Sequence, residues 1–356
     1  MGAARCIKKD ALLTWLEEVG KSRLVLAPRA QGKSTAFLPF DPAKGISLSG
    51  LATSSPKQAL IPRHEALLEF RYTKTDQVPA QTGLAVRELI PNQPTLVFGA
   101  RPCDARGFTV LDRVYDAGAK RDVYYCARRD KTIVATVACT EPADTCFCNR
   151  VGGGPGDSAG SDILVTELDQ LYVLEAVTQR GEAFLLEQKL PDATELADKA
   201  QAARAAVRAA MPEGDSLLGA PDKVGALFDE MPFWDGVAAK CLSCGACSYL
   251  CPTCYCFNIT DESKGGQGVR VRTWDNCMSF QFTLEGSGHN PRATKSQRMR
   301  NRVGHKFCYY PTLHDGALSC VGCGRCIAHC PVSMDIRRIV SKALTYEKAA
   351  KEHSNV

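Results

Sequence analysis

Eight of the 18 cysteines in this 356-residue chain fall into two runs with the same spacing. Residues 241–252 read CLSCGACSYLCP and residues 320–331 read CVGCGRCIAHCP, so each run is C-x2-C-x2-C-x3-C-P. In two-cluster iron–sulfur domains, three cysteines of such a run hold one [4Fe–4S] cube and the fourth ligates the other cube. The spacing predicts one cluster bound by Cys241, Cys244, Cys247 and Cys330, and a second bound by Cys320, Cys323, Cys326 and Cys251.

Two zinc knuckles are the alternative for these runs. A zinc site pairs two C-x2-C units around one tetrahedral ion, so four cysteines per run with a following proline fit it poorly. Glycines between the cysteines also let the backbone pass close to inorganic sulfide. The iron–sulfur interpretation is therefore the strongest signal in the chain.

A third group of cysteines lies in the segment CTEPADTCFC, residues 139–148. The apolar run TIVATVA precedes it, and a second run, TLVFGA, precedes Cys103 in RPCD. If both runs are parallel neighbouring strands, their carboxyl ends meet at one edge, where sites form in open α/β sheets. We expect a further [4Fe–4S] cluster bound by Cys103, Cys139, Cys146 and Cys148. A structural zinc site and unligated thiols remain open as alternatives.

Six cysteines belong to none of these sets. Cys254, Cys256 and Cys277 form a weak C-x-C pattern that either holds another metal or packs around the clusters and tunes them. Cys6 and Cys126 are interpreted as ordinary thiols. The sequence assigns no role to Cys308.

The bulk composition excludes several classes of protein. The net charge of +5 is too small to indicate a nucleic-acid partner. No apolar run approaches the roughly 20 residues that span a bilayer, and the N-terminus lacks a signal-peptide core. We therefore expect no membrane insertion and a cytoplasmic location, where clustered cysteines usually mean metal.

The chain is expected to be an α/β N-terminal domain followed by an α+β ferredoxin-like domain for two [4Fe–4S] clusters. The α/β domain is placed at residues 1–190, with strands at 23–27, 95–100, 132–138 and 163–168 and a helix at 104–115. An alanine-rich helix within 193–210 and a second at 222–231 form a helical bridge over 191–231. The cluster domain covers 232–356 and contains an insertion at 252–319. Residues 1–20 are interpreted as an amphipathic helix with Asp10 as the cap of the segment from Ala11.

Two further segments carry weaker signals. Residues 292–306 hold six Lys or Arg and no acid, which indicates either a docking face for an acidic partner or flavin phosphate, or an ordinary basic surface. Residues 27–35, APRAQGKST, approach a phosphate-binding loop but have Ala27 in place of its first glycine, so a surface loop is expected.

The motifs together resemble a known family. The runs CLSCGACSYLCPTCYCF, WDNC, GHNPR, HKF and CVGCGRC, with SPK at 55–57, GARPCD, CTEPADTCFC and GGGPG, are similar to iron–sulfur subunits of cytosolic flavin-linked oxidoreductases. The related kinds are the sulfhydrogenase β subunit and the iron–sulfur subunits of two other systems. These systems are anaerobic sulfite reductase and the flavin oxidoreductase that works beside heterodisulfide reductase. The likeness covers most of the chain.

The resemblance implies an electron-transfer subunit in a hetero-oligomer. It would relay electrons between a flavin subunit that handles NAD(P)H and a catalytic or bifurcating redox module, without catalysing the end reaction. Flavin is expected on the partner. A catalytic reductase acting at the N-terminal cluster and a zinc-bearing interaction protein are the rival functions.

Overall fold

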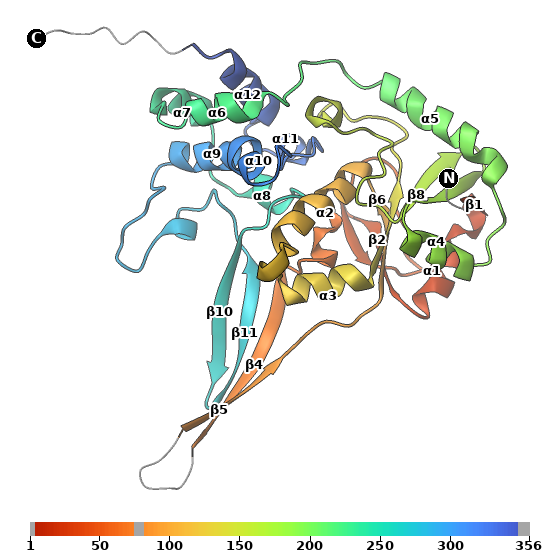
Figure 1. Cartoon of the computed structure of the whole chain (residues 1–356), viewed down its shortest axis with the longest axis horizontal. Coiled ribbons are helices and arrows are strands. Elements are labelled where there is room, and N and C mark those ends of the chain that lie inside the picture. Colours follow the sequence, from red (N-terminus) through yellow and green to blue (C-terminus); the bar gives the residue numbers. More distant parts are fainter. Residues whose placement is uncertain (1–3, 75–81, 348–356) are drawn as a thin grey trace, which may run out of the picture.

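The computed structural model describes residues 4–74 and 82–347. Figure 1 shows three regions: an α/β body, a group of short helices beside it, and a narrow arm of strands that projects from both. The described helices are all too short or too polar to cross a bilayer.

A seven-stranded sheet forms the centre of the body, in the order β1-β9-β8-β7-β6-β2-β3. The four central strands are parallel, and the remaining three pair antiparallel at the edges. The parallel strands are β2 (Leu24–Gln31), β6 (Thr95–Ala100), β7 (Thr132–Val137) and β8 (Ile163–Leu168). The edge strands are β1 (Ala4–Lys8), β3 (Ser34–Pro39) and β9 (Leu171–Ala176). Every residue of β6 and β7 is buried, as expected for strands with helices on both faces.

Helices cover both faces of this sheet. On one face, Trp15 of α1 (Leu12–Gly20) makes edge-on ring contacts with Phe98 of β6 and Phe184 of α4 (Gln179–Glu187). On the other face, α2 (Pro102–Tyr115) and α3 (Val123–Lys131) pack on the alternate residues of the same strands, including Val97. The alternation of side chains along β6 thus fills two cores.

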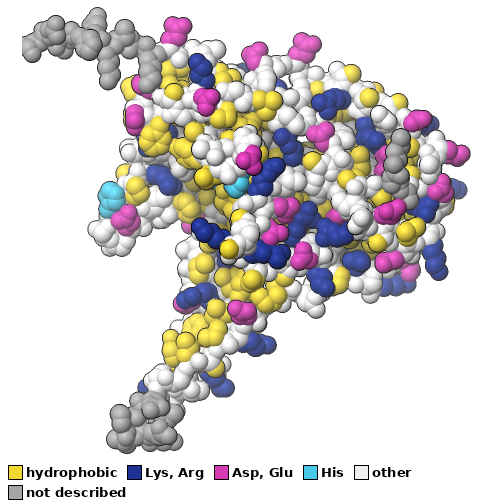
Figure 2. Space-filling model, viewed as in Figure 1, with side chains coloured by type: hydrophobic (Ala, Val, Ile, Leu, Met, Phe, Trp, Pro, Cys, Tyr) yellow, Lys and Arg dark blue, Asp and Glu magenta, His cyan; other side chains and the backbone are white. Residues whose placement is uncertain are grey.

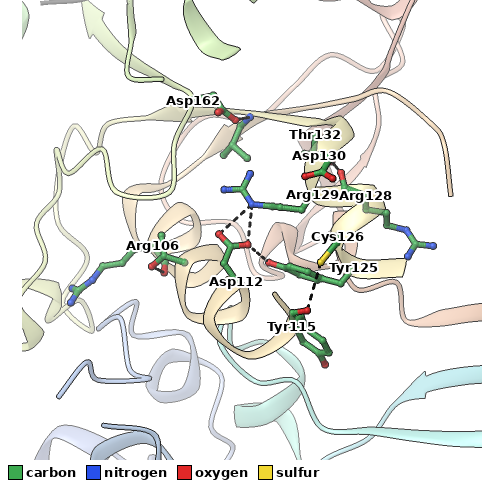
Figure 3. Close-up of polar contacts among 12 residues, drawn as sticks. Arg106, Asp112, Tyr115, Tyr125, Cys126, Arg128, Arg129, Asp130, Thr132 and Asp162 are labelled. Atoms are coloured by element: carbon green, nitrogen blue, oxygen red, sulfur yellow. Dashed lines mark hydrogen bonds and ion pairs between the residues drawn. The ribbon is translucent and has the colours of Figure 1, made fainter. Parts of the chain in front are cut away.

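A polar network fixes α2 against α3 (Figure 3). The Asp112 carboxylate accepts a hydrogen bond from Tyr125 Oη at 2.6 Å and another from Arg129 Nε at 3.1 Å. The Cys126 thiol donates to the Tyr115 carbonyl at 3.6 Å, which agrees with an ordinary buried thiol. The network holds α2 in place, and α2 carries Cys103 in its first turn.

Short helices of the C-terminal part form a second group, and most of them pack into a core around Trp234, which is fully buried. This group consists of α6 (Ala220–Ala226), α7 (Met231–Ala238), α8 (Ala246–Tyr249), α9 (Lys295–Gly304), a π-helical turn His305–Tyr309, α10 (Tyr310–Leu313), α11 (Arg325–Ala328) and α12 (Ile336–Thr345). Single 3-10 turns occur at Lys9–Ala11, Pro56–Ala59, Gly118–Lys120, Cys148–Val151, Thr194–Leu196 and Gln281–Thr283.

The arm is a four-stranded antiparallel sheet in the order β10-β11-β4-β5. Its strands are β4 (His64–Lys74), β5 (Thr82–Glu88), β10 (Phe257–Lys264) and β11 (Gln267–Trp274). Figure 2 shows hydrophobic side chains exposed along it. Tyr72, Leu84 and Val86 of its strands are each more than half exposed. Because β11 pairs with β4, the predicted insertion at 252–319 and the predicted N-terminal domain share one sheet.

Several local predictions were wrong. Residues 4–8 form an edge strand instead of the start of a helix, and Ala11, not Asp10, is the N-cap of α1. The helix predicted at 222–231 is two helices, α6 and α7. By contrast, the alanine-rich helix predicted within 193–210 is confirmed as α5 (Ala197–Ala209), which packs on the sheet through Ala200 beside Leu168 and Val173. Residues 27–35 lie in the β2–β3 hairpin, so no helix follows them to bind phosphate.

Candidate iron–sulfur site

The twelve cysteines of the three predicted sets line three cavities. Cys103, Cys139, Cys146 and Cys148 line the first, which we call the N-terminal cavity. Cys251, Cys320, Cys323 and Cys326 line the middle cavity. Cys241, Cys244, Cys247 and Cys330 line the C-terminal cavity. The structure thus brings together each set of four as the sequence grouped them.

The N-terminal cavity lies at the carboxyl ends of two central strands. β6 and β7 are parallel neighbours, with Val97 opposite Val134. β6 leads into α2, where Pro102 occupies the first turn and Asp104 caps the Arg101 amide at 3.2 Å. After β7, the Cys139 amide donates to the Pro155 carbonyl at 2.9 Å, so the 139–155 loop returns to the strand end. This sheet edge therefore gathers cysteines that are far apart in sequence.

The loop carrying Cys146 and Cys148 packs directly on the second cysteine run. The Phe147 amide donates to the Gly322 carbonyl at 2.9 Å. A Cβ on Gly322 would lie 2.6 Å from the backbone nitrogen of Cys148, and one on Gly324 would lie 2.4 Å from the Thr145 carbonyl oxygen. Both glycines are needed for this contact between residues 145–148 and residues 322–325, which we call the seam.

A buried ion pair ties the seam to α2. Arg325 Nη1 and Nη2 donate to the two carboxylate oxygens of Asp104 at 2.6 and 3.0 Å, and Arg325 Nε donates to the Ala52 carbonyl at 2.8 Å. Only 1% of each charged side chain is exposed. Asp104 follows Cys103 and Arg325 lies two residues after Cys323, so this pair positions one cysteine of the N-terminal cavity and one of the middle cavity.

The two ferredoxin-like runs adopt the same backbone conformation. Ser243 and Gly322, which occupy equivalent positions, have φ of 55° and 68°. Gly245 and Gly324, two residues later, have φ of 77° and 74°, and α8 and α11 start directly after them. Left-handed conformations at both positions turn the chain tightly around the cysteines. Sulfur also receives backbone hydrogen bonds, since the Ser243 amide donates to Cys241 Sγ at 3.4 Å and the Met334 amide donates to Cys330 Sγ at 3.2 Å.

The three cavities form a continuous row. Gly322 and Cys323 line both the N-terminal and the middle cavity. Arg302 and Cys326 line both the middle and the C-terminal cavity. Each neighbouring pair of cavities is therefore separated by a shared wall that contains a cysteine.

Burial makes several of these cysteines poor thiolates in the absence of metal. Desolvation raises the pKa of Cys139 to about 12 and that of Cys148 to about 11. Desolvation also raises the pKa of Cys326 to about 12. A coordinating metal deprotonates a thiol outright, so a soft, thiolate-seeking metal centre fits these sets of four. The described residues contain no group of three or more His, Cys, Asp or Glu arranged to hold one single metal ion.

Comparisons with known proteins agree with the geometry. The family model for a 4Fe–4S dicluster domain matches residues 240–334. The chain is 29% identical to sulfhydrogenase 2 subunit beta of Pyrococcus furiosus, over 92% of this chain and 93% of that protein. No solved structure matches. Both likenesses support the interpretation of the chain as a β-type iron–sulfur subunit.

The dicluster match and the likeness to the sulfhydrogenase subunit support an iron–sulfur electron-transfer subunit with 4Fe–4S clusters in its C-terminal part. Three other cysteines stand outside the cavities. Cys254 is buried, and its carbonyl accepts a hydrogen bond from Lys57 Nζ at 2.9 Å, while Cys277 Sγ lies 3.7 Å from Ser248 Oγ. Neither these two nor Cys256 lines any of the three cavities. Cys308 Sγ packs against α6, near Gly225.

The sequence interpretation of this subunit missed a set of buried cations. Arg298, Arg302 and Lys306 come from the basic segment for which a docking face or an ordinary surface is expected, yet they are 7%, 5% and 3% exposed. Lys57, in the SPK motif, is also 3% exposed, and its ammonium lies 4.1 Å from the centre of the Trp274 ring. The signal is present in the sequence, because a spacing of four places residues 298, 302 and 306 on one helix face. The buried Met299 and Val303 mark that face as internal.

Proposed function

We propose that this subunit carries three [4Fe–4S] clusters, one in each cavity, and relays electrons along the row. Cys103, Cys139, Cys146 and Cys148 would hold the N-terminal cluster. Cys251, Cys320, Cys323 and Cys326 would hold the middle cluster, and Cys241, Cys244, Cys247 and Cys330 the C-terminal one. A bound cluster of this kind exchanges electrons at a potential set by its charge, its hydrogen bonds and its exposure.

The proposal rests mainly on the walls that neighbouring cavities share. Cys323 belongs to both the N-terminal and the middle cavity, and Cys326 to both the middle and the C-terminal cavity. The protein's own contribution is to hold the three sets of thiols in fixed order within one packed core. The seam and the Arg325–Asp104 pair supply that rigidity for the first two cavities.

The row has two ends, which suits a relay between two partners. Cys244, at the C-terminal end, is exposed, and Cys139, at the other end, is half-buried. We assign the two ends to a flavin subunit that handles NAD(P)H and to a catalytic or bifurcating redox module. This assignment is supported by the likeness to a protein named as a sulfhydrogenase subunit.

Iron and acid-labile sulfide analysis of the anaerobically purified chain tests the cluster number. Three cubes give about 12 irons per chain and two give about 8, at four irons per cube. Cys146→Ser should lower the iron content by about 4, whereas Cys6→Ser, which changes a half-buried cysteine outside the cavities, should leave it unchanged. A value near 8 in the wild type and in Cys146→Ser would remove the N-terminal cluster from the proposal.

A second measurement separates a relay from a reductase. The isolated chain should accept electrons from a chemical reductant, with bleaching of its cluster absorbance, but should not oxidise NADH or NADPH. Sustained pyridine-nucleotide oxidation by the chain alone would contradict the relay.

A further inference from the structure

Two unpaired cations face the middle cavity. Lys306 and Arg302 both line it, and they are 3% and 5% exposed. Lys306 Nζ donates to Cys251 Sγ at 3.4 Å and to Thr253 Oγ1 at 2.8 Å, and the same hydroxyl lies 3.2 Å from that sulfur. Arg302 Nε has no hydrogen-bond partner among the described residues. These groups therefore face sulfur rather than a carboxylate.

The charged side chains at the other two cavities are arranged differently. At the N-terminal cavity, Arg101 is accompanied by Glu141, and its guanidinium donates to backbone carbonyls, including that of Ala138 at 2.9 Å. Arg325, beside the seam, is neutralised by Asp104. The C-terminal cavity has Arg302 at the wall shared with the middle cavity, but Lys306 does not reach it. Among the residues that the structure describes, the middle cavity thus holds two cations without a counter-ion.

Local backbone structure places Lys306 at this point. The residue lies in the π-helical turn His305–Tyr309, which continues α9, and the Ser319 amide donates to the Lys306 carbonyl at 3.0 Å. Ser319 directly precedes Cys320, a ligand candidate of the middle cavity. π-Turns inserted in α-helices frequently occur at functional sites.

Burying two cations without a counter-charge costs several kcal/mol each, so the arrangement requires an anion. A cube with four thiolates is anionic, and each added electron makes it more so. A fixed cation stabilises the reduced form more than the oxidised form and raises the potential, whereas burial alone would lower it. The middle cavity is the one in which burial is most complete, since all of its lining residues except the half-buried Cys326 are buried.

We propose that Lys306 and Arg302 raise the reduction potential of the middle cluster, so that the most deeply buried position of the row remains reducible. This inference rests on the proposed function. Lys306 acts on the middle cluster alone, and Arg302 acts on the middle and C-terminal clusters, because it lines both of their cavities. They are tuning residues, and neither is a ligand.

The test is a redox titration of the anaerobically purified full chain, followed by electron paramagnetic resonance. Lys306→Gln should shift one midpoint to a more negative potential, by at least about 59 mV, which is a tenfold change for a one-electron couple. Lys306→Arg, which keeps the charge, should leave all midpoints near their wild-type values. Arg302→Gln should shift two midpoints. Lys342→Gln, which removes an exposed lysine on α12, is the matched control and should shift none.

The possible results distinguish failure of the tuning role from failure of the electron relay. Unchanged midpoints in Lys306→Gln, or an equal shift of every midpoint, would overturn the tuning role while leaving the relay intact. A wild-type iron content well below about 8 per chain, which is less than two cubes, would overturn the relay itself. If the Lys306→Gln variant does not bind its clusters, Arg302→Gln tests the tuning role instead. A shift of two midpoints in that variant supports the tuning role, and the absence of any shift overturns it.

Discussion

The seam and the arm differ in how deeply their charged groups are buried and in how closely their backbone segments approach. At the seam, charged groups are buried and backbones approach so closely that only glycine fits. Along the arm, ion pairs such as Arg270–Asp261 are nearly half exposed, and the turn at Gly265 opens to solvent. The same interactions should therefore have very different energies in the two regions, because burial removes solvent screening and prevents relaxation.

The largest effect is expected from the ion pair at the seam. Arg325→Ala leaves the Asp104 carboxylate buried without its partner, which should cost about 3–5 kcal/mol. At about 2.1 cal/mol/K per residue, this corresponds to a fall of about 5 °C in melting temperature, measured by anaerobic calorimetry. The double variant Arg325→Met, Asp104→Leu should recover much of the loss. A loss below about 1 kcal/mol for Arg325→Ala would show that the seam is hydrated.

An intermediate effect is expected from a matched pair of glycines. Gly322 and Gly265 have φ of 68° and 63°, so alanine meets similar backbone strain of about 1–2 kcal/mol at either position. Only at Gly322 does the new Cβ collide with Cys148, which adds about 1–3 kcal/mol of overpacking. Gly322→Ala should therefore lower the melting temperature more than Gly265→Ala and should also reduce the iron content. Equal effects of both substitutions would contradict the close approach at the seam.

The smallest effect is expected on the arm itself. Arg270→Ala removes an ion pair with Asp261 whose side chains are 47% and 45% exposed, and because solvent screens this pair, the melting temperature should hardly change. The iron content should not change. Comparison of the melting curves of Arg270→Ala and Arg325→Ala at low and high salt would sharpen the contrast, since only the exposed pair should respond to screening. An unfolding cost for Arg270→Ala as large as that for Arg325→Ala would contradict it.

The same contrast explains what the sequence could and could not predict. The prediction of buried strands at 95–100 and 163–168 is confirmed, because continuous apolar runs leave little choice of structure. The arm was missed, because β10 reads FNITDESK and every one of its residues is exposed, so it has no buried face to produce a pattern. Residues 4–8 run into the amphipathic segment of α1 without a break, which is why the pattern predicts helix where the structure has a strand.

The candidate site, too, has parts that the sequence predicted and parts that it did not. The cysteine spacing and the strand-end argument placed Cys103 and Cys139 at one cavity, because parallel neighbours must end at the same edge. Nothing in the spacing indicated that residues 145–148 would pack on residues 322–325, since this contact joins segments that are far apart in the chain. Composition alone predicts a surface position for Arg302 and Lys306. The spacing of four between residues 298, 302 and 306 instead places them on one helix face, which is buried.

The seam also has a consequence for biosynthesis. A nascent chain that has emerged as far as residue 150 already presents Cys103, Cys139, Cys146 and Cys148, but it lacks the wall of the N-terminal cavity that Gly322 and Cys323 provide. The second run, which supplies this wall and most of the middle cavity's cysteines, is among the last parts of the chain to be translated, and it packs on the earlier loop. Neither set of thiols is enclosed until nearly the whole chain has left the ribosome, so insertion of iron and sulfide into these two positions is expected to follow translation rather than accompany it.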